Sequence, residues 1–166
     1  DLNALRPQIV GAGNLERFDY LLDCMKSYKL MAEYGCVRDD YETALANSNW
    51  NTALNHRKNM ARLHEQFQTM FIERIANVTD LGAICHMEIL NWYQLVQLKT
   101  DSELEAGLGG PIPSDANPTT DYLGSAFVKV VPVETQVNAG ESLTLKVLIM
   151  ENPTSATLYY RPLGGG

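Results

Sequence analysis

The chain has 166 residues and a formal net charge of −7. A surface of that sign repels phosphate backbones, and no cluster of Lys and Arg offsets it locally, so nucleic acid is excluded as an expected partner. Hydrophobic residues make up 45% of the sequence, which excludes a disordered chain, and no apolar run approaches the roughly 20 residues needed to span a bilayer.

Both ends of the sequence have the character of a segment cut from something longer. The first residue is Asp1, with no basic and then apolar leader before it, and the sequence stops at three glycines after two strand-like runs. Either a leader has been removed or the chain begins inside a longer protein, and we expect the second.

Hydrophobic periodicity predicts helices over most of the first hundred residues. A first helix is expected to have Asn14 as its N-cap and to end at Gly35, because glycine readily adopts the left-handed conformation of a C′ position. A shorter helix is predicted over residues 37–46. After a break at "NSNWN", a long helix is predicted over 50–76 and a last one over 79–98.

The long helix is predicted to have one buried and one solvated side. The buried side is expected to carry Leu54, Met60, Leu63, Phe67, Met70, Phe71 and Ile75. The solvated side is expected to carry Arg57, Lys58, Arg62, Glu65, Glu73 and Arg74. The last helix is apolar around much of its circumference, so we expect it to be covered on more than one side.

The pattern changes after residue 100. Residues 101–122 are dense in Gly, Pro, Asn, Asp and Ser, which predicts a linker between two domains. Strand-like alternation follows in "SAFVKVVPV", "NAGESLTLKVLIM" and "TLYYRPL", and turn sequences separate these runs. Three such strands are too few for an immunoglobulin-like sandwich, so we expect the others to come from polypeptide outside this sequence or from another chain.

The predicted architecture is therefore α+β with segregated domains. It consists of a helical bundle of three to four helices over residues 1–100, a linker over 101–122, and an incomplete immunoglobulin-like β-sandwich over 123–166.

No constellation of residues identifies a reaction. The three histidines lack the spacing of a metal site and are interpreted as structural, and the three cysteines as buried small hydrophobes, with one disulfide and a leftover thiol as the alternative. The glycines of "GAGNLERF" have no strand before them and lack a third glycine, so they are interpreted as a turn into the first helix. We assign no catalytic residue, no metal and no cofactor.

Aromatic side chains are the remaining candidates for ligand contact, because their flat faces can pack against a pyranose ring. The carbohydrate-binding candidates are Trp50, Trp92, Tyr93 and Tyr160. In the alternative interpretation Trp92 belongs to the core and Tyr160 to the surface of a strand. Asn77, in the triplet "NVT", is a glycosylation acceptor only in a eukaryotic secretory setting, and in a bacterial protein it is a helix cap.

Two stretches carry a resemblance to known proteins. "GAGNLERFDYLLDCMKSYKLM" resembles the helical region that follows the catalytic barrel in large secreted bacterial proteins of glycoside-hydrolase type. "VPVETQVNAGESLTLKVLIMENPTSATLYYRPLGGG" resembles the start of an immunoglobulin-like or fibronectin-like sandwich near the ends of such proteins. The resemblance implies a carbohydrate-active setting in which this piece is scaffold, and no barrel pattern exists here to carry catalytic carboxylates.

These observations predict a non-catalytic scaffold or accessory segment of a larger secreted carbohydrate-processing protein, located outside the cytoplasm. Its expected partners are the remaining domains of a longer chain or a neighbouring copy, with polysaccharide as a candidate ligand. The alternative is a self-associating structural subunit whose sandwich is completed by strands from a neighbouring chain. An independent enzyme is the least favoured reading.

Overall fold

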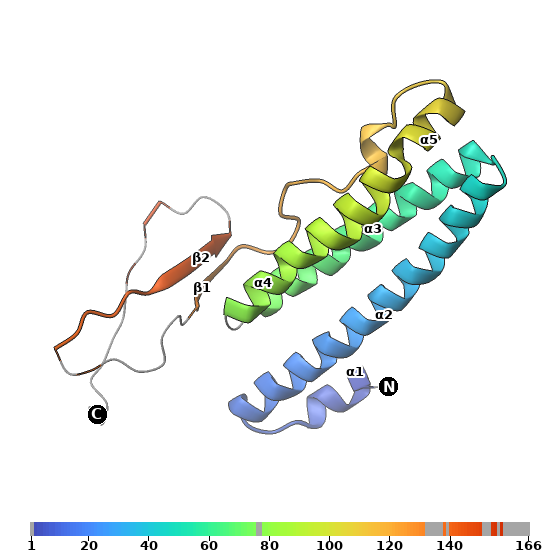
Figure 1. Cartoon of the computed structure of the whole chain (residues 1–166). Helices are drawn as coiled ribbons and strands as arrows, with labels where there is room; N and C mark the ends of the chain where they lie inside the picture. The colour runs from blue at the N-terminus through green and yellow to red at the C-terminus, as the bar shows by residue number, and fades with distance from the viewer. Residues whose placement is uncertain are drawn as a thin grey trace.

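The computed structural model describes residues 2–75, 78–131, 138, 140–150, 154, 155 and 157. Helices dominate this part of the chain and a two-stranded sheet follows them, so the coarse α+β class is confirmed (Figure 1). In chain order the elements are α1 (Leu2–Leu5), the 3₁₀ turn η1 (Arg6–Gln8), α2 (Ala12–Ala46), α3 (Trp50–Arg74), α4 (Val78–His86), the π-helix η2 (Met87–Gln97), α5 (Leu98–Leu108), the 3₁₀ turn η3 (Ser114–Ala116), β1 (Phe127–Val131) and β2 (Lys146–Met150).

α2 is one helix of 35 residues, where the sequence predicts two. It begins after Gly11, whose φ of 92° suits glycine, and Asn14 lies inside its first turn with its amide donating to the carbonyl oxygen of Val10. Gly35 continues the helix. An interior glycine costs only about 0.5–1 kcal/mol relative to alanine, which packing of the neighbouring Tyr34 against the core can offset. The predicted cap at Asn14 and the predicted end at Gly35 are wrong.

The break between α2 and α3 is confirmed at the predicted "NSNWN". α2 ends at Ala46 and α3 begins at Trp50, and Ser48 between them adopts a positive φ of 56°. The buried side of α3 is confirmed at Met60 and Phe67, which are almost wholly covered. Short polar side chains that compete for backbone hydrogen bonds account for the break, as local chemistry predicts.

Arg57 departs from the predicted solvated side of α3, because its side chain is completely buried. Its Nη1 lies 2.6 Å from Oδ1 of Asp101. Its Nε donates to the carbonyl oxygen of Ala116 at 3.0 Å, and its Nη2 donates to Oδ1 of Asn117 at 2.8 Å. A buried guanidinium requires partners of this kind, and all three lie more than 40 residues away along the chain, so the periodicity of α3 could not indicate them.

α4, η2 and α5 form one continuous helical rod (Figure 1). The rod continues to Leu108, whereas the sequence predicts an end near residue 98. It stops where Gly109 takes the left-handed conformation, with φ of 71°. The first part of the predicted linker is therefore helix, and the predicted division into domains stays a prediction.

The three long helical segments meet in a core near the turn between α2 and α3. The cluster consists of Tyr41, Ala44, Leu45, Ala53, Met60, Ala61, Trp92, Val96 and Leu104. Within it the hydroxyls of Tyr41 and Thr100 lie 2.7 Å apart, which joins α2 to α5. Each large apolar side chain buried here contributes roughly 1.5–3 kcal/mol, so this end of the bundle is the well-anchored one. Towards its start, α2 buries only Leu22 and Ser27 among its described residues.

The segment between α5 and β1 is tied to α3 along its length. Ala116 is fully buried, and the amide of Thr119 donates to Oε1 of Glu65 at 2.8 Å. Further on, the amide of Ser125 donates to Oε1 of Glu73 at 3.2 Å. These contacts hold the segment against the helical part of the molecule.

β1 and β2 pair antiparallel, in a register that sets Phe127 opposite Met150 and Val130 opposite Val147. The hairpin lies beyond the α4 end of the helices (Figure 1). One face turns towards them, since the ring of Phe127 meets that of Tyr122 edge-on and Lys129 donates to the carbonyl oxygen of Glu73. The opposite face carries exposed valines.

The predicted strands are confirmed in part. β1 lies within "SAFVKVVPV", and β2 occupies only the last five residues of "NAGESLTLKVLIM". The run "TLYYRPL" lies outside the described residues apart from Thr157. The immunoglobulin-like sandwich therefore stays a prediction.

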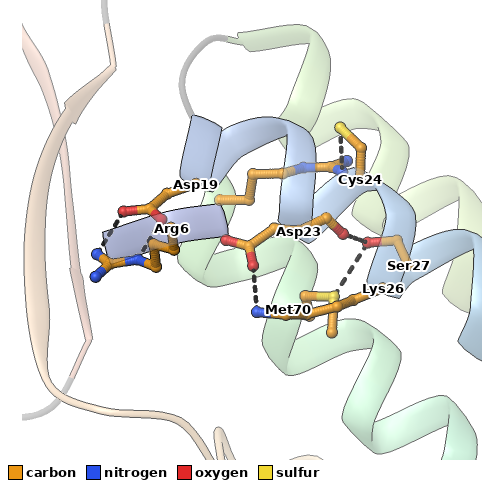
Figure 2. A network of polar contacts seen from close by, with 8 residues as sticks. Arg6, Asp19, Asp23, Cys24, Lys26, Ser27 and Met70 are labelled. Carbon is orange, nitrogen blue, oxygen red and sulfur yellow. Dashed lines mark hydrogen bonds and ion pairs between the residues drawn. The ribbon is translucent and has the colours of Figure 1, made fainter. Parts of the chain in front are cut away.

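Polar contacts fasten the start of α2 to its surroundings, as Figure 2 shows. Arg6 of η1 forms an ion pair with Asp19 at 2.6 Å, and Lys26 forms one with Asp23 at 2.9 Å. The hydroxyl of Ser27 donates to the carbonyl oxygen of Asp23 and lies 3.1 Å from the sulfur of Met70 on α3. Because these ion pairs are exposed to solvent, each contributes little to stability.

The three cysteines are free thiols, which overturns both sequence interpretations of them. Cys36 and Cys85 are exposed, and Cys24 is half-buried, where Arg74 donates to its sulfur at 3.2 Å. Cys36 and Cys85 therefore face solvent, whereas Cys24 lies against the end of α3.

Candidate ligand-binding cleft

A cleft of about 370 Å³ opens between α3, η2 and the segment after η3. That volume is within the usual range for small-molecule sites. The side chains around it combine aromatic rings with amides, hydroxyls and one carboxylate. They are His64, Gln68, Glu88, Ile89, Trp92, Tyr93, Gln97, Pro118, Thr119 and Thr120.

The π-helix η2 supplies half of these residues. A π-helix is wider than an α-helix and is often found at functional sites, because its extra residue per turn changes which side chains share a face. Glu88, Trp92 and Tyr93 all come from this helix and all line the cleft. Trp92 is only 4% exposed and forms the floor, whereas Tyr93 is 50% exposed and forms a wall.

The floor contains two buried nitrogens that have no hydrogen-bond partner among the described residues: Nε2 of His64 and Nε1 of Trp92. The two rings lie 5.4 Å apart between centroids. Burial lowers the pKa of His64 from its ordinary 6.5 to about 4, so the imidazole is neutral at neutral pH. Unpaired buried polar atoms are uncommon in folded proteins, and among the described residues Nε of Arg38 and Nε of Arg74, outside this cleft, also have no partner.

The wall opposite η2 is held by α3. The buried Arg57 fixes Ala116 and Asn117 through two hydrogen bonds, and Glu65 fixes the amide of Thr119. The Arg57 guanidinium also lies 5.6 Å from the centroid of the Trp92 ring, so one residue supports both the wall and the floor. Such support keeps the shape of the cleft in the absence of a ligand.

The charges around the cleft disfavour anions. No Lys or Arg is among the described residues that line it, and Glu88 places a carboxylate at its edge. A group of three or more metal-ligating side chains is absent from the part of the chain that the structure describes. The arrangement can accept and donate hydrogen bonds and pack against an apolar ring face.

The structure brings together two of the predicted carbohydrate-binding residues. Trp92 and Tyr93 both line the cleft, and Trp92 is also a core residue, as the alternative interpretation predicts. Trp50 lies elsewhere, at the start of α3, where its ring packs directly against Gly107. Tyr160 and Asn77 lie outside the described residues.

Most of the other lining residues could not be recognised from the sequence. The spacing of Glu88, Trp92 and Tyr93 is a usable signal, because residues four and five apart share a face of a helix close to the π form. No sequence spacing could have predicted that Gln68 and Thr119 line the same cleft, because α3 and the segment after η3 come together only in the folded chain.

No protein-family model, curated protein or solved structure matches this chain. Within the described residues, no helix has both the length and the apolar character that crossing a bilayer demands.

Proposed function

We propose that this chain is a non-catalytic scaffold that docks against another protein domain through one face of α2. The observation that carries the proposal is a group of large apolar side chains that stay exposed along the first half of this helix. They are Tyr20, Leu21, Met25, Tyr28 and Met31, with exposed fractions between 44% and 66%.

These residues share one side of α2. At about 100° per residue they fall within an arc of about 140°, and no charged residue between Tyr20 and Met31 falls inside that arc. Leu22 and Ser27 turn the other way, and Ser27 contacts α3. α3 covers this arc only in part: the guanidinium of Arg74 lies 5.5 Å from the centroid of the Tyr20 ring and donates to the sulfur of Cys24, and the five apolar side chains keep the exposed fractions given above.

A continuous apolar face of this size supports docking. Single exposed hydrophobic residues are normal, but five on one helix face mark an interaction surface. The N-terminal segment does not remove the face from solvent, because the exposed fractions above are those with α1 and η1 in place. Covering the face would contribute several kcal/mol, at roughly 25 cal/mol per Å² of buried apolar area.

The occupant that we propose is another domain of a larger carbohydrate-processing protein. The support for this setting is the resemblance of residues 11–31 to the helical region that follows a catalytic barrel, and the exposed face lies within that stretch. The scaffold would hold that domain close to the β1–β2 hairpin, because Arg74 at the end of α3 contacts Tyr20, and the adjacent Glu73 contacts Ser125 and Lys129.

Hydroxyl-radical footprinting tests the proposal, because methionine and tyrosine are readily oxidised when exposed. The 166-residue chain and the polypeptide expressed from its whole gene would be compared. We expect oxidation of Met25, Tyr28 and Met31 to fall several-fold in the second sample. Met60 is fully buried and serves as the unreactive control in both. Equal oxidation of the α2 face in the two samples overturns the proposal.

A second candidate function rests on the sheet. An antiparallel sheet that covers helices with one face usually presents polar residues on the other. Here the outer face carries Val128, Val130 and Val147, with exposed fractions of 63%, 44% and 48%. This observation favours the self-associating subunit, in which strands of a neighbouring copy cover the valines.

Sedimentation of the isolated chain separates the two candidates. The subunit candidate predicts a concentration-dependent oligomer that the double variant Val128→Thr, Val130→Thr returns to a monomer. The scaffold candidate predicts a monomer in both cases, with the α2 face oxidised at every concentration.

A further inference from the structure

We propose that the cleft beside η2 binds one ring of a neutral sugar, with Tyr93 as the packing surface and Glu88, Gln68, Gln97 and Thr119 as the hydrogen-bonding groups. This proposal goes beyond the docking function, because the cleft is formed by α3, η2 and the segment after η3 and not by the apolar face of α2.

The charge of the lining favours a neutral ligand. Glu88 contributes a negative charge, and His64 stays neutral at physiological pH because its side chain is buried. With no Lys or Arg among the described lining residues, a phosphate or carboxylate would lose hydration without gaining a cationic partner. Nucleotides, sugar phosphates and organic acids are therefore disfavoured.

The hydrogen-bonding groups match a ring that carries several hydroxyls. The amides of Gln68 and Gln97 each provide donors and an acceptor, the hydroxyls of Thr119 and Thr120 provide both, and Glu88 accepts. A polyol presents a donor and an acceptor at every hydroxyl, so it can satisfy all of these groups together. A flat heterocycle has fewer polar positions along its edge and would leave some of them unpaired.

The shape of the cleft agrees with the same ligand class. Tyr93 offers an exposed ring on one side, and the C–H groups on one face of a pyranose can pack against such a ring. The cleft volume of about 370 Å³ holds one pyranose with some water and is too small for an oligosaccharide to be enclosed. A longer chain would leave the cleft over the exposed Ile89.

The floor adds a separate observation that points to a ligand. His64 and Trp92 are each more than nine-tenths buried and line the cleft, and each has a nitrogen without a partner. Two unpaired buried nitrogens cost stability, and evolution of a stable core would replace them with apolar atoms. Both nitrogens are inaccessible to a water molecule, so pairing with a ligand hydroxyl would require the His64 or Trp92 ring to turn towards the cleft.

Tryptophan fluorescence can report binding at this position alone. The chain has two tryptophans, so the variant Trp50→Phe leaves Trp92 as the one indole. The probes are glucose, galactose, xylose, N-acetylglucosamine, cellotetraose and xylotetraose, with adenosine and glucose 6-phosphate as comparison ligands. A ligand of this size in a site with few contacts is expected to have a dissociation constant of the order of 1 mM.

Variants decide whether the signal comes from the cleft. We expect Tyr93→Ala to weaken sugar binding roughly tenfold, which is the usual contribution of one packed ring. Gln94→Ala changes the next residue of η2, which is exposed and outside the cleft, and is expected to leave binding unchanged. The dissociation constant of glucose 6-phosphate should be larger than that of glucose. Glu88→Gln removes the negative charge from the cleft and should bring the two dissociation constants closer together.

Three results would overturn the proposal. The first is that no neutral sugar changes the fluorescence at concentrations up to 50-fold above about 1 mM. The second is that Gln94→Ala and Tyr93→Ala weaken sugar binding equally. The third is that adenosine or glucose 6-phosphate binds more tightly than any neutral sugar. Circular dichroism of each variant establishes that a loss of binding is not a loss of fold. These sugar-binding outcomes do not depend on the docking proposal, because they are measured at the cleft and the docking proposal concerns the α2 face.

Discussion

Arg57 and Asp101 form an ion pair in which Nη1 and Oδ1 lie 2.6 Å apart and the guanidinium is completely buried. The pair joins α3 to α5, and the same guanidinium holds Ala116 and Asn117 by hydrogen bonds. One side chain therefore links two helices and the segment that forms a wall of the cleft. Its removal should affect both stability and the shape of the cleft.

Replacing Arg57 with methionine should lower the free energy of unfolding by roughly 3–5 kcal/mol, because the variant leaves a carboxylate and two oxygen acceptors without their donor. The urea midpoint of unfolding measures this change. Lys58→Met is the matched control, since it removes the neighbouring exposed pair with Asp115, which is worth at most about 1 kcal/mol. Similar midpoints for the two variants would contradict the structural role of Arg57.

The stability of the chain should depend on pH through His64. The unfolded chain takes up a proton as the pH falls through 6.5, whereas the folded chain does so only near its pKa of about 4. The stability contributed by the neutral imidazole is therefore complete above pH 6.5 and is lost as the pH falls from there towards 4. Between pH 7.5 and pH 5 the expected loss is about 2 kcal/mol.

His64→Gln should flatten that part of the pH profile, measured by urea unfolding at intervals of half a pH unit. His86→Gln removes an exposed imidazole and serves as the control. A slope that survives in His64→Gln would show that another group is responsible.

Gly35→Ala should stabilise the chain by about 0.5–1 kcal/mol, because alanine lowers the entropy of the unfolded state and suits a helix interior. The structure shows open space around the position that the new methyl group would occupy. Thermal unfolding monitored by circular dichroism measures the change. A lower melting temperature would instead support a helix that ends at Gly35.

Gly107→Ala should have the opposite effect and destabilise the chain by roughly 1–3 kcal/mol. A methyl group at this position would overlap the indole of Trp50, which must then move. Gly82→Ala, in open space on α4, is the control. Combining Gly107→Ala with Trp50→Ala should recover part of the loss, and additive effects would contradict the contact.

The features that the sequence predicted correctly depend on neighbouring residues. The break at "NSNWN", the buried side of α3 at Met60 and Phe67, and β1 all follow from backbone preferences and hydrophobic periods within a few residues. The error at Gly35 is of a different kind. A weak local preference for ending a helix gave way there to the packing of Tyr34 against a core that α2 shares with other helices.

The tertiary structure alone decided the surroundings of Arg57 and the composition of the cleft. The partners of Arg57 lie 44 to 60 residues away, and Thr119 meets Glu65 across 54 residues. A periodic pattern reports which side of a helix is apolar, but it does not report which distant segment covers that side. Contacts between such segments depend on how the whole chain folds. The sequence pattern around an arginine is therefore the same whether the packed helices leave it exposed or bury it.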